Sequence, residues 1–298
     1  MAKQLSQDVV LQWVSLASGN FNTRQMWAEL NIVTLEGKAY LRVCLGRLVD
    51  AGVIAKTSLD GTFRKLDNEK EVMDWESADT SNYLPIKLPF GLHEHCLVYP
   101  KSIIVVAGGK DGGKTAFLLE TLKLNYPNFV IDFFNSETGR EQFKNRVTPL
   151  NLPSPAPFYT FQRYDNFADV IDPTHFSIID YLDFNSEVYL VGEEIDRIFR
   201  KKTTGVAVIG LQKPPPTKTL VKGKIVLIER DLAYGGAFSI KRAILYVSLS
   251  GNRLKVISAK TPKNPKVRLA NMQWSYSFDD NGFFTDIKRY YGDTNDTI

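Results

Sequence analysis

The most constraining feature of the sequence is a glycine-rich turn between two apolar runs, in the stretch AGGKDGGKTAFLLE from Ala107 to Glu120. The apolar residues 103 to 107 predict a buried strand, and the run after the turn is long enough for a helix. The turn fits the pattern G-x-x-x-x-G-K-[ST], whose fixed positions are Gly108, Gly113, Lys114 and Thr115. A strand, a loop and a helix in this order predict a phosphate-binding loop.

The residue types of this loop indicate its chemistry. Glycines let backbone N–H groups turn inward around phosphate oxygens, Lys114 adds a point charge, and the Thr115 hydroxyl suits Mg²⁺. The positive end of the helix dipole faces the same ligand. We therefore predict that the loop binds ATP with Mg²⁺, through Gly108, Gly109, Lys110, Asp111, Gly112, Gly113, Lys114, Thr115 and Ala116.

The composition sets the broad class of protein. With 298 residues, of which 44% are hydrophobic and 23% charged, the chain is long enough for one large globular domain and a small one. The net charge of +4 is too small to indicate a nucleic-acid partner, so local charge has to decide that question. Two distant cysteines, no signal-peptide pattern and no apolar run near about 18 residues favour a cytoplasmic protein without a membrane segment.

Residues 1 to 66 have the pattern of a small domain of their own. Helices are predicted over about 6 to 17, 22 to 31 and 36 to 51, the last with an apolar stripe at Leu41, Cys44, Leu45 and Leu48. Two short strands follow, joined at the hairpin dipeptide Asp60-Gly61. Three helices and a hairpin in this order resemble a winged helix-turn-helix. Residues 67 to 84 are acidic and weakly periodic, which predicts a linker.

This winged-helix candidate carries cations that a DNA partner would contact. Lys38 and Arg42 lie off the apolar stripe of the third helix, and Lys56 and Arg64 lie on the hairpin. In DNA-binding winged helices such side chains contact phosphates. Acidic neighbours such as Glu36 dilute the charge, so a protein-docking winged helix with a solvated face is the alternative.

Residues 85 to 298 predict a second domain, in which strand and helix signals alternate. After the loop and its helix come NFVIDFF (strand), TGREQFKNRV (helix), HFSIIDYLDF (strand), SEVYLVGEEIDRIFRKK (helix) and GVAVIGLQ (strand). This alternation predicts an α/β domain with a mainly parallel sheet and helices on both faces. The stretches RAILYVSL and RLKVISAK predict a terminal hairpin added to that sheet.

Two carboxylates stand near strand ends in this pattern. Asp180 lies at the tip of the strand HFSIIDYLDF, where it would orient Mg²⁺ beside Thr115. The next residue is Tyr181, whereas ATPases of the ABC and AAA types usually carry a catalytic Glu there. Glu137 follows the preceding strand and supplies the missing acid, placed to accept a proton from the water that attacks the γ-phosphate. A plain helix-terminal acid near the dipole is the alternative for Glu137.

A resemblance to a known family rests on three segments, FFNSETGREQF, IIDYLDF and VAVIGLQKPPP. In order and spacing they resemble the successive motifs of the RecA/DnaB superfamily of ATPases, over about residues 85 to 270. The resemblance implies a RecA-like sheet, with Glu137 as catalytic base, Asp180 as magnesium-orienting acid and Gln212 as the sensor that links the γ-phosphate to a DNA-binding loop. A winged helix stands where replicative helicases of the family carry their own N-terminal domain.

The same resemblance implies two further features. The superfamily places a finger residue that acts on a neighbouring subunit near the end of the late hairpin, and AKTPKNPK offers Lys260 and Lys263 there. A solvated basic strand end is the alternative for either lysine. The mobile DNA-binding loop would follow Gln212, where residues 213 to 242 hold seven basic and two acidic side chains, a net charge of +5, and glycines that favour flexibility. Lys218, Lys222 and Lys224 are the predicted contacts to single-stranded DNA, with a solvated charge run as the alternative.

The expected function is that of a DNA-dependent ATPase acting as a homo-oligomer, a helicase-like or recombinase-like motor. The alternative is an ATP-controlled DNA-binding regulator or loader that does not translocate, with the winged helix choosing the duplex site. A small-molecule P-loop kinase is disfavoured, because the sequence offers no Arg-rich lid and its carboxylates suit water activation.

Overall fold

The computed structural model describes residues 5–17, 19–66, 70, 72–182, 190–221 and 224–292. The chain divides into two compact units, Met1–Ala78 and Asp79–Ile298, and each has its own core. The division falls inside the segment that is predicted as a linker.

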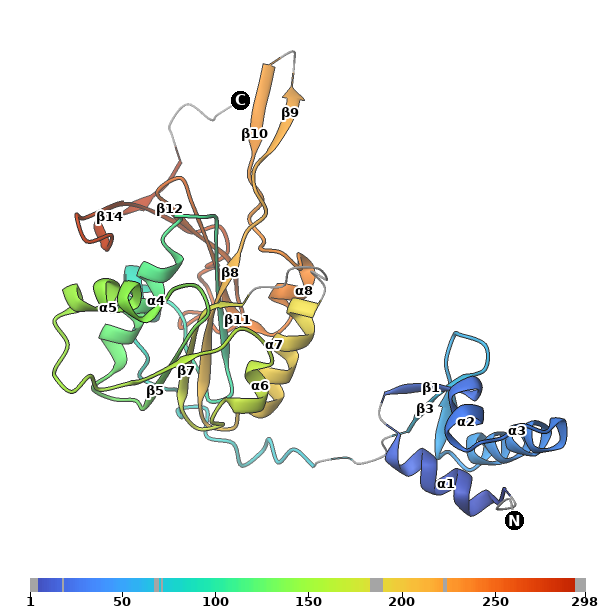
Figure 1. The fold of residues 1–298 in the computed structure, drawn as a ribbon. Coiled ribbons are helices and arrows are strands. Elements are labelled where there is room, and N and C mark those ends of the chain that lie inside the picture. The colour runs from blue at the N-terminus through green and yellow to red at the C-terminus, as the bar shows by residue number, and fades with distance from the viewer. Residues whose placement is uncertain are drawn as a thin grey trace. The chain divides into compact units, whose positions relative to one another are not determined.

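Unit 1 consists of three helices and a three-stranded antiparallel sheet (Figure 1). Along the chain these are α1 (Gln7–Leu16), β1 (Asn20–Asn22), α2 (Thr23–Glu29), α3 (Leu35–Asp50), β2 (Ile54–Lys56) and β3 (Thr62–Lys65). The side chains of Ser6, Asn22 and Thr34 each accept a hydrogen bond from a backbone N–H three residues further on, which fixes the three helix starts. The predicted helices and hairpin are confirmed, and β1, which pairs with β3, is an addition to them.

Unit 2 is built on a nine-stranded sheet in the order β14-β13-β12-β11-β4-β8-β7-β5-β6. The strands are β4 (Ile103–Gly108), β5 (Ile131–Asn135), β6 (Tyr159–Gln162), β7 (Phe176–Leu182), β8 (Val206–Gln212), β11 (Ala243–Ser250), β12 (Arg253–Ala259), β13 (Gln273–Phe278) and β14 (Phe284–Tyr290). From β11 to β6 all neighbours are parallel, and β12, β13 and β14 extend the sheet antiparallel. The predicted α/β class with a mainly parallel sheet is confirmed.

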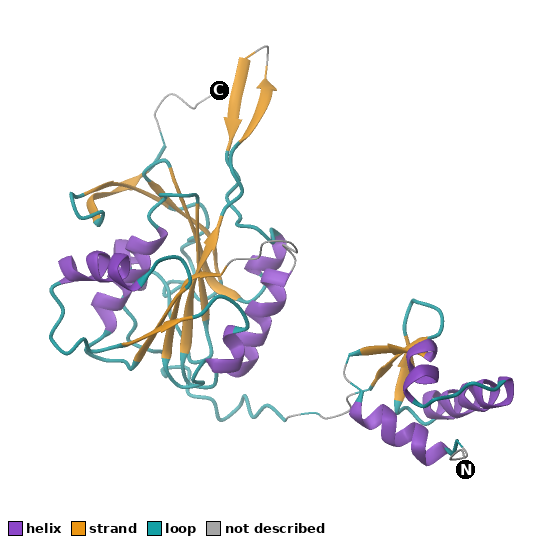
Figure 2. Ribbon diagram, viewed as in Figure 1, coloured by secondary structure: helices purple, strands orange, loops and turns teal. Residues whose placement is uncertain are grey.

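Helices cover both faces of the sheet (Figures 1 and 2). They are η1 (Pro89–Glu94), α4 (Lys114–Asn125), α5 (Arg140–Val147), η2 (Thr148–Leu150), α6 (Phe167–Val170), α7 (Leu190–Lys201) and α8 (Ala237–Ile240). Because side chains alternate along a strand, Ile104 and Val106 of β4 pack with Phe117 of α4 on one face. On the other face Ile103 and Val105 share a core with α6 and α7. The strand β4 is therefore buried on both sides, which explains its uninterrupted apolar run.

The segment after β8 differs from its prediction. In place of a flexible loop, β9 (Thr217–Val221) and β10 (Lys224–Ile228) form a two-stranded antiparallel ribbon that extends away from the sheet (Figure 1). The physical reason is the density of β-branched residues in TKTLV and KIVLI, which favours strands more than the nearby glycines oppose them. Lys222 lies outside the described residues, and only the main chain of Lys224 is described.

Candidate nucleotide site

A cavity of about 700 Å³ lies at the carboxyl ends of the parallel strands. The glycine-rich loop of residues 108–116, called the P-loop below, forms its floor. Glu137 after β5, Tyr181 of β7 and Gln212 of β8 line one end, and the turn between β13 and β14 lines the other. Its lining residues are Lys110, Asp111, Gly112, Gly113, Lys114, Thr115, Ala116, Leu119, Glu137, Arg146, Tyr181, Gln212, Phe278, Asn281, Gly282 and Phe283. The predicted loop residues therefore line one cavity, except for Gly108 and Gly109 at the end of β4.

Two glycines of the P-loop are required by its geometry. Gly113, the N-cap of α4, has a φ of 89°, a left-handed conformation that L side chains rarely adopt. A Cβ on Gly108 would lie 2.7 Å from Cγ of Lys114, so a side chain there would displace the lysine stem. The loop thus brings backbone N–H groups at the start of α4 to the cavity floor, which is the arrangement that binds phosphate.

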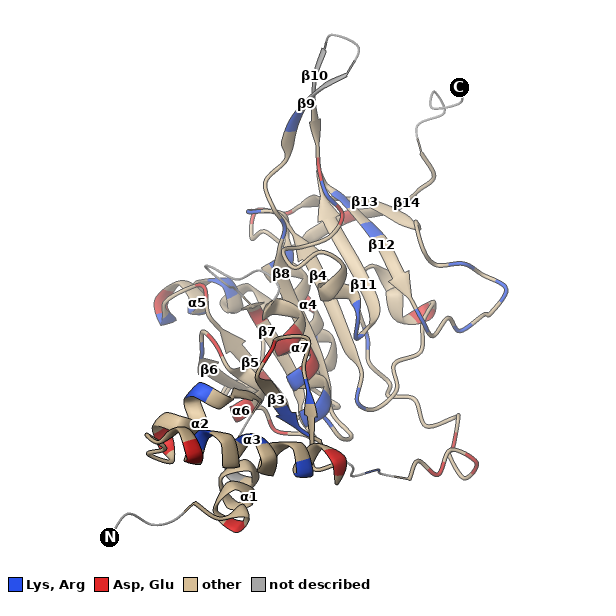
Figure 3. Ribbon diagram, turned by 90° about the vertical axis from the view of Figure 1, so that its right-hand side faces the viewer, with Lys and Arg blue, Asp and Glu red and all other residues tan. Residues whose placement is uncertain are grey.

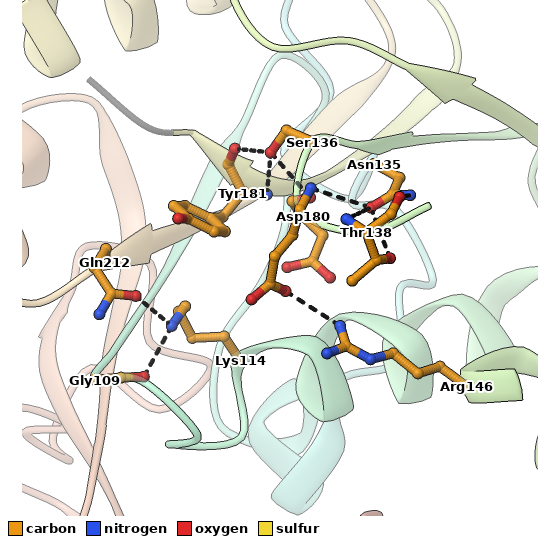
Figure 4. Close-up of polar contacts among 10 residues, drawn as sticks. Gly109, Lys114, Asn135, Ser136, Thr138, Arg146, Asp180, Tyr181 and Gln212 are labelled. Atoms are coloured by element: carbon orange, nitrogen blue, oxygen red, sulfur yellow. Dashed lines mark hydrogen bonds and ion pairs between the residues drawn. The ribbon is translucent and has the colours of Figure 1, made fainter. Parts of the chain in front are cut away.

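Lys114 is buried, and its ammonium group is fully hydrogen-bonded within the chain (Figure 4). Nζ donates to the carbonyl oxygens of Gly108 at 3.1 Å and Gly109 at 2.9 Å, and to Oε1 of Gln212 at 2.8 Å. Burial lowers the pKa of Lys114, and nearby carboxylates, chiefly Asp180, act in the opposite direction. The predicted phosphate lysine and the predicted sensor glutamine are therefore in direct contact.

Asp180 lies on β7 and is only 3% exposed, so it is behind the cavity lining and not part of it. Burial raises its pKa to about 6, while a hydrogen bond with the Thr115 side chain lowers it. Its Oδ1 is buried without a hydrogen-bond partner. A buried, unsatisfied carboxylate oxygen next to a threonine hydroxyl fits Mg²⁺, which binds through one or two protein oxygens together with substrate phosphates. The described residues contain no group of three His, Cys, Asp or Glu side chains suited to a metal, and a magnesium site of this kind needs none.

Glu137 stands on a short loop after β5 that polar side chains hold in place. Oδ1 of Asn135 accepts hydrogen bonds from the backbone N–H groups of Glu137 at 3.3 Å and Thr138 at 3.2 Å. The Ser136 hydroxyl donates to the carbonyl oxygen of Tyr181, and its oxygen accepts from the backbone N–H of Tyr181 at 2.9 Å. The loop is thereby fixed to the end of β7, the strand that carries Asp180.

Arg146 of α5 also lines the cavity and contacts Glu137 directly, with Nη1 3.1 Å from Oε2 of the glutamate (Figure 4). Both side chains are 41% exposed. No sequence pattern singles out this arginine, because α5 also carries Arg140 and Lys144. Only the strand order, which sets β5 beside β7, brings this helix to the cavity.

Gln212 connects the P-loop to the β9–β10 ribbon. It ends β8, which lies between β4 and β7 in the sheet. The backbone N–H of Lys213 donates to the Gly108 carbonyl at 3.0 Å, so the P-loop and the first residue after β8 are bonded directly. The buried ammonium of Lys213 also donates to the hydroxyls of Ser248, at 3.1 Å, and Ser250 on β11. The base of the ribbon is therefore joined to both strands that flank the P-loop strand.

The other end of the cavity is aromatic and comes from the turn between β13 and β14. Phe278 and Phe283 line it, and Tyr276 donates a hydrogen bond to the Gly112 carbonyl at 3.3 Å. The backbone N–H of Phe284 donates to Glu120 of α4 at 2.9 Å. Trp274, Tyr276 and Phe278 alternate with polar residues, which is the sequence signal that indicates this strand.

Lys260 and Lys263 lie far from this cavity in the same chain. Ala259 of β12 pairs with Leu245, whereas Gly108 pairs with Leu249 at the far end of β11. The two lysines thus follow the strand at the end of the sheet opposite the P-loop, and Nζ of Lys260 donates to the Lys241 carbonyl at 3.0 Å. Their predicted role concerns a neighbouring subunit, so it stays a prediction.

The predicted DNA contacts fall on two surfaces. In unit 1 Arg42, Lys56 and Arg64 are exposed, and Nζ of Lys38 lies 4.8 Å from the centre of the Trp27 ring. Lys56 pairs with Phe63 and Arg64 pairs with Ala55, so these two cations leave the sheet on opposite faces. In unit 2 Lys218 is exposed on β9, and Figure 3 shows basic residues on β9 and β12.

Comparison with protein-family models and with curated proteins gives no match for this sequence. Within the described part of the chain no helix is long and apolar enough to cross a membrane.

Proposed function

We propose that the chain is an ATP-binding, DNA-dependent ATPase of the RecA/DnaB type that acts as an oligomeric, helicase-like or recombinase-like motor on DNA. One observation carries the proposal. Lys114, Glu137 and Gln212 come from α4, the loop after β5 and the end of β8, and they line one cavity with Asp180 buried beside it. The resemblance assigns these four residues to ATP hydrolysis, and the parallel sheet supports a RecA-like fold.

The residues of the cavity divide the work of hydrolysis in this proposal. The P-loop N–H groups and Lys114 bind the phosphates. Phe278 and Phe283 at the aromatic end contact the adenine base of the nucleotide. Glu137 orients the attacking water and accepts its proton. Thr115 and Asp180 would hold Mg²⁺, which neutralises phosphate charge when bound.

Coupling to DNA follows the path through Gln212. Phosphate oxygens that compete for Lys114 release Gln212, whose main chain leads directly into the β9–β10 ribbon. Lys218 and Lys224 of the ribbon strands, together with Lys222 between them in the sequence, contact single-stranded DNA in this proposal. Unit 1, with the element order of a winged helix-turn-helix, adds Lys38 and Arg42. Neighbouring subunits of a homo-oligomer would supply Lys260 or Lys263 to each site.

A second candidate is an ATP-controlled DNA-binding regulator or loader that does not translocate. The observation that favours it is unit 1, whose three capped helices and antiparallel sheet suit duplex recognition. ATP-dependent strand displacement supports the motor. Footprints confined to duplex sites, together with slow turnover, support the regulator.

The Lys114→Ala variant tests the nucleotide site. We expect ATP affinity to fall roughly 10- to 100-fold and hydrolysis to be lost, because a charged hydrogen-bond donor to phosphate is removed. Lys123→Ala is the matched control, since Lys123 is an exposed lysine of the same helix outside the cavity. ATPase rates are measured without DNA, with single strands and with duplex, beside a mass measurement of the assembly. Parental hydrolysis by Lys114→Ala contradicts the proposal.

A further inference from the structure

Two cations that line the cavity, Lys114 and Arg146, each contact a side chain that the proposed hydrolysis needs. Lys114 donates to Gln212 at 2.8 Å, and Arg146 contacts Glu137 at 3.1 Å. The side chains to which the proposal gives the roles of catalytic base and sensor, Glu137 and Gln212, therefore each contact a cation in this structure. Oε2 of Glu137 accepts this hydrogen bond from the Arg146 guanidinium.

The contact between Arg146 and Glu137 is weak enough to be exchanged. Both side chains are 41% exposed, and ion pairs at this exposure contribute little in water. A terminal phosphate carries more charge than a carboxylate, and its oxygens match the planar fork of a guanidinium. In competition between the two acceptors, the phosphate wins.

Arg146 is placed to contact the terminal phosphate of the nucleotide, and not its adenine base. Arg146 contacts Glu137 and lines the cavity with Tyr181 and Gln212, which come from β7 and β8 on one side of β4 in the sheet. Phe283 comes from the turn between β13 and β14, on the other side of β4. Its charge also lowers the pKa of Asp180 against the effect of burial, so the guanidinium lies within electrostatic reach of the buried acid. A nucleotide that lacks the third phosphate offers Arg146 no phosphate oxygen here, so Glu137 remains its acceptor.

We propose that Arg146 distinguishes ATP from ADP by exchanging Glu137 for the γ-phosphate, so that Glu137 becomes free to hold water only when a triphosphate is bound. The inference rests on the proposed nucleotide site and adds a regulatory step to it. Arg146 then acts as a γ-phosphate contact, and the ion pair keeps Glu137 inactive in the empty and ADP-bound states.

Nucleotide affinities test this exchange. Binding of ADP and of the β,γ-imido analogue of ATP is measured for the full chain, for Arg146→Gln and for Arg146→Lys. We expect Arg146→Gln to weaken the triphosphate analogue about tenfold and ADP less than twofold, and Arg146→Lys to keep most of the preference. Arg140→Gln is the control, because Arg140 is on the same helix, 93% exposed and outside the cavity. Equal weakening of both nucleotides, or of neither, overturns the inference.

A double-variant cycle separates exchange from simple charge removal. Glu137→Gln should tighten the triphosphate analogue relative to ADP, since Arg146 no longer has an ion pair to break. In the Arg146→Gln background the same change should give no such gain. A gain of equal size in both backgrounds means that lost repulsion, and not exchange, is the cause, and it refutes the inference. If the parental chain binds neither nucleotide, the nucleotide site itself is wrong.

Discussion

At the scale of single residues, burial makes the ionised form of Asp180 unfavourable for the stability of the fold. Asp180 is 3% exposed, its Oδ1 has no hydrogen-bond partner, and burial raises its pKa to about 6. A folded-state pKa above the unfolded value of about 3.9 means that the folded protein binds this proton first as the pH falls. Ionised Asp180 therefore destabilises the fold above about pH 6, and this cost disappears as the pH falls toward 4. A magnesium ion at Thr115 would offset it.

The Asp180→Asn variant should consequently be more stable than the parent in the absence of magnesium and nucleotide. The amide keeps the shape but removes the buried charge, which corresponds to roughly 2 to 3 kcal/mol at pH 8. We expect the melting temperature of the variant to exceed that of the parent by several degrees at pH 8, with the difference shrinking by pH 5. Thermal melts in EDTA across this range measure it. A variant that melts lower at pH 8, or a difference independent of pH, contradicts this account.

Residue types and positions predicted Lys114, Glu137 and Asp180, and the family resemblance added Gln212. The fold brings all four to one place. Each stands at the end of a strand or the start of a helix, positions that a sequence marks clearly. Arg146 is different, because it reaches Glu137 nine residues away only through the way α5 packs on the sheet. The hydrogen bonds between Ser136 and Tyr181 depend in the same way on β5 lying beside β7. Those of Asn135 are local to the loop after β5.

At the scale of elements, the β13–β14 hairpin forms a wall of the cavity that the sequence analysis did not predict. It closes the cavity with Phe278 and Phe283 and rests on the P-loop through Tyr276. The ring of Phe284 stacks on Phe278 at 5.5 Å and meets Tyr276 edge-on at 4.8 Å, so the hairpin is held by an aromatic cluster. The predicted hairpin of β11 and β12 is confirmed, but it is not terminal, because β13 and β14 follow it in the chain.

Loss of the Phe283 ring should weaken nucleotide binding. Stacking of a base on an aromatic side chain contributes roughly 1–3 kcal/mol, so Phe283→Ala should lower ATP affinity between about 5- and 100-fold. Phe283→Tyr keeps the ring and should bind ATP like the parent. Phe161→Ala, an exposed aromatic of β6 outside the cavity, is the control for a general effect of removing a ring. Inorganic triphosphate, which has no base, should bind Phe283→Ala and the parent equally well, and a loss there would place the ring elsewhere.

Element prediction succeeded where one pattern dominated. The strand β4 is apolar throughout because both its faces are covered, and its position is evident from sequence. The β9–β10 ribbon was not predicted, because glycines and lysines interrupt its β-branched residues and composition alone then favours a loop. Pairing between strands is a long-range property, and a local pattern does not fix which strands become neighbours.

At the scale of the whole molecule, the exposed cations that we predict to contact DNA lie on two separate units. Lys218 stands on the ribbon of unit 2, whereas Arg42, Lys56 and Arg64 stand on unit 1. Exposed lysines that contact phosphates release counterions, so each contact adds to the salt dependence of DNA binding. Salt dependence measured on variants of each unit therefore reports which unit meets which form of DNA.

The ribbon should account for binding of single strands. The log of affinity should fall with the log of salt concentration at a slope of about −0.7 per neutralised phosphate. Replacing Lys218, Lys222 and Lys224 by Ala should make this slope shallower by about two and remove DNA-stimulated hydrolysis. ATP binding without DNA should survive, because the ribbon begins beyond Gln212 and none of its described side chains lines the cavity. The Lys38→Ala/Arg42→Ala variant of unit 1 is the comparison, and it should alter the slope for duplex DNA only. An unchanged slope for single strands in the ribbon variant, with normal stimulation, would assign DNA binding to unit 1 alone and favour the regulator over the motor.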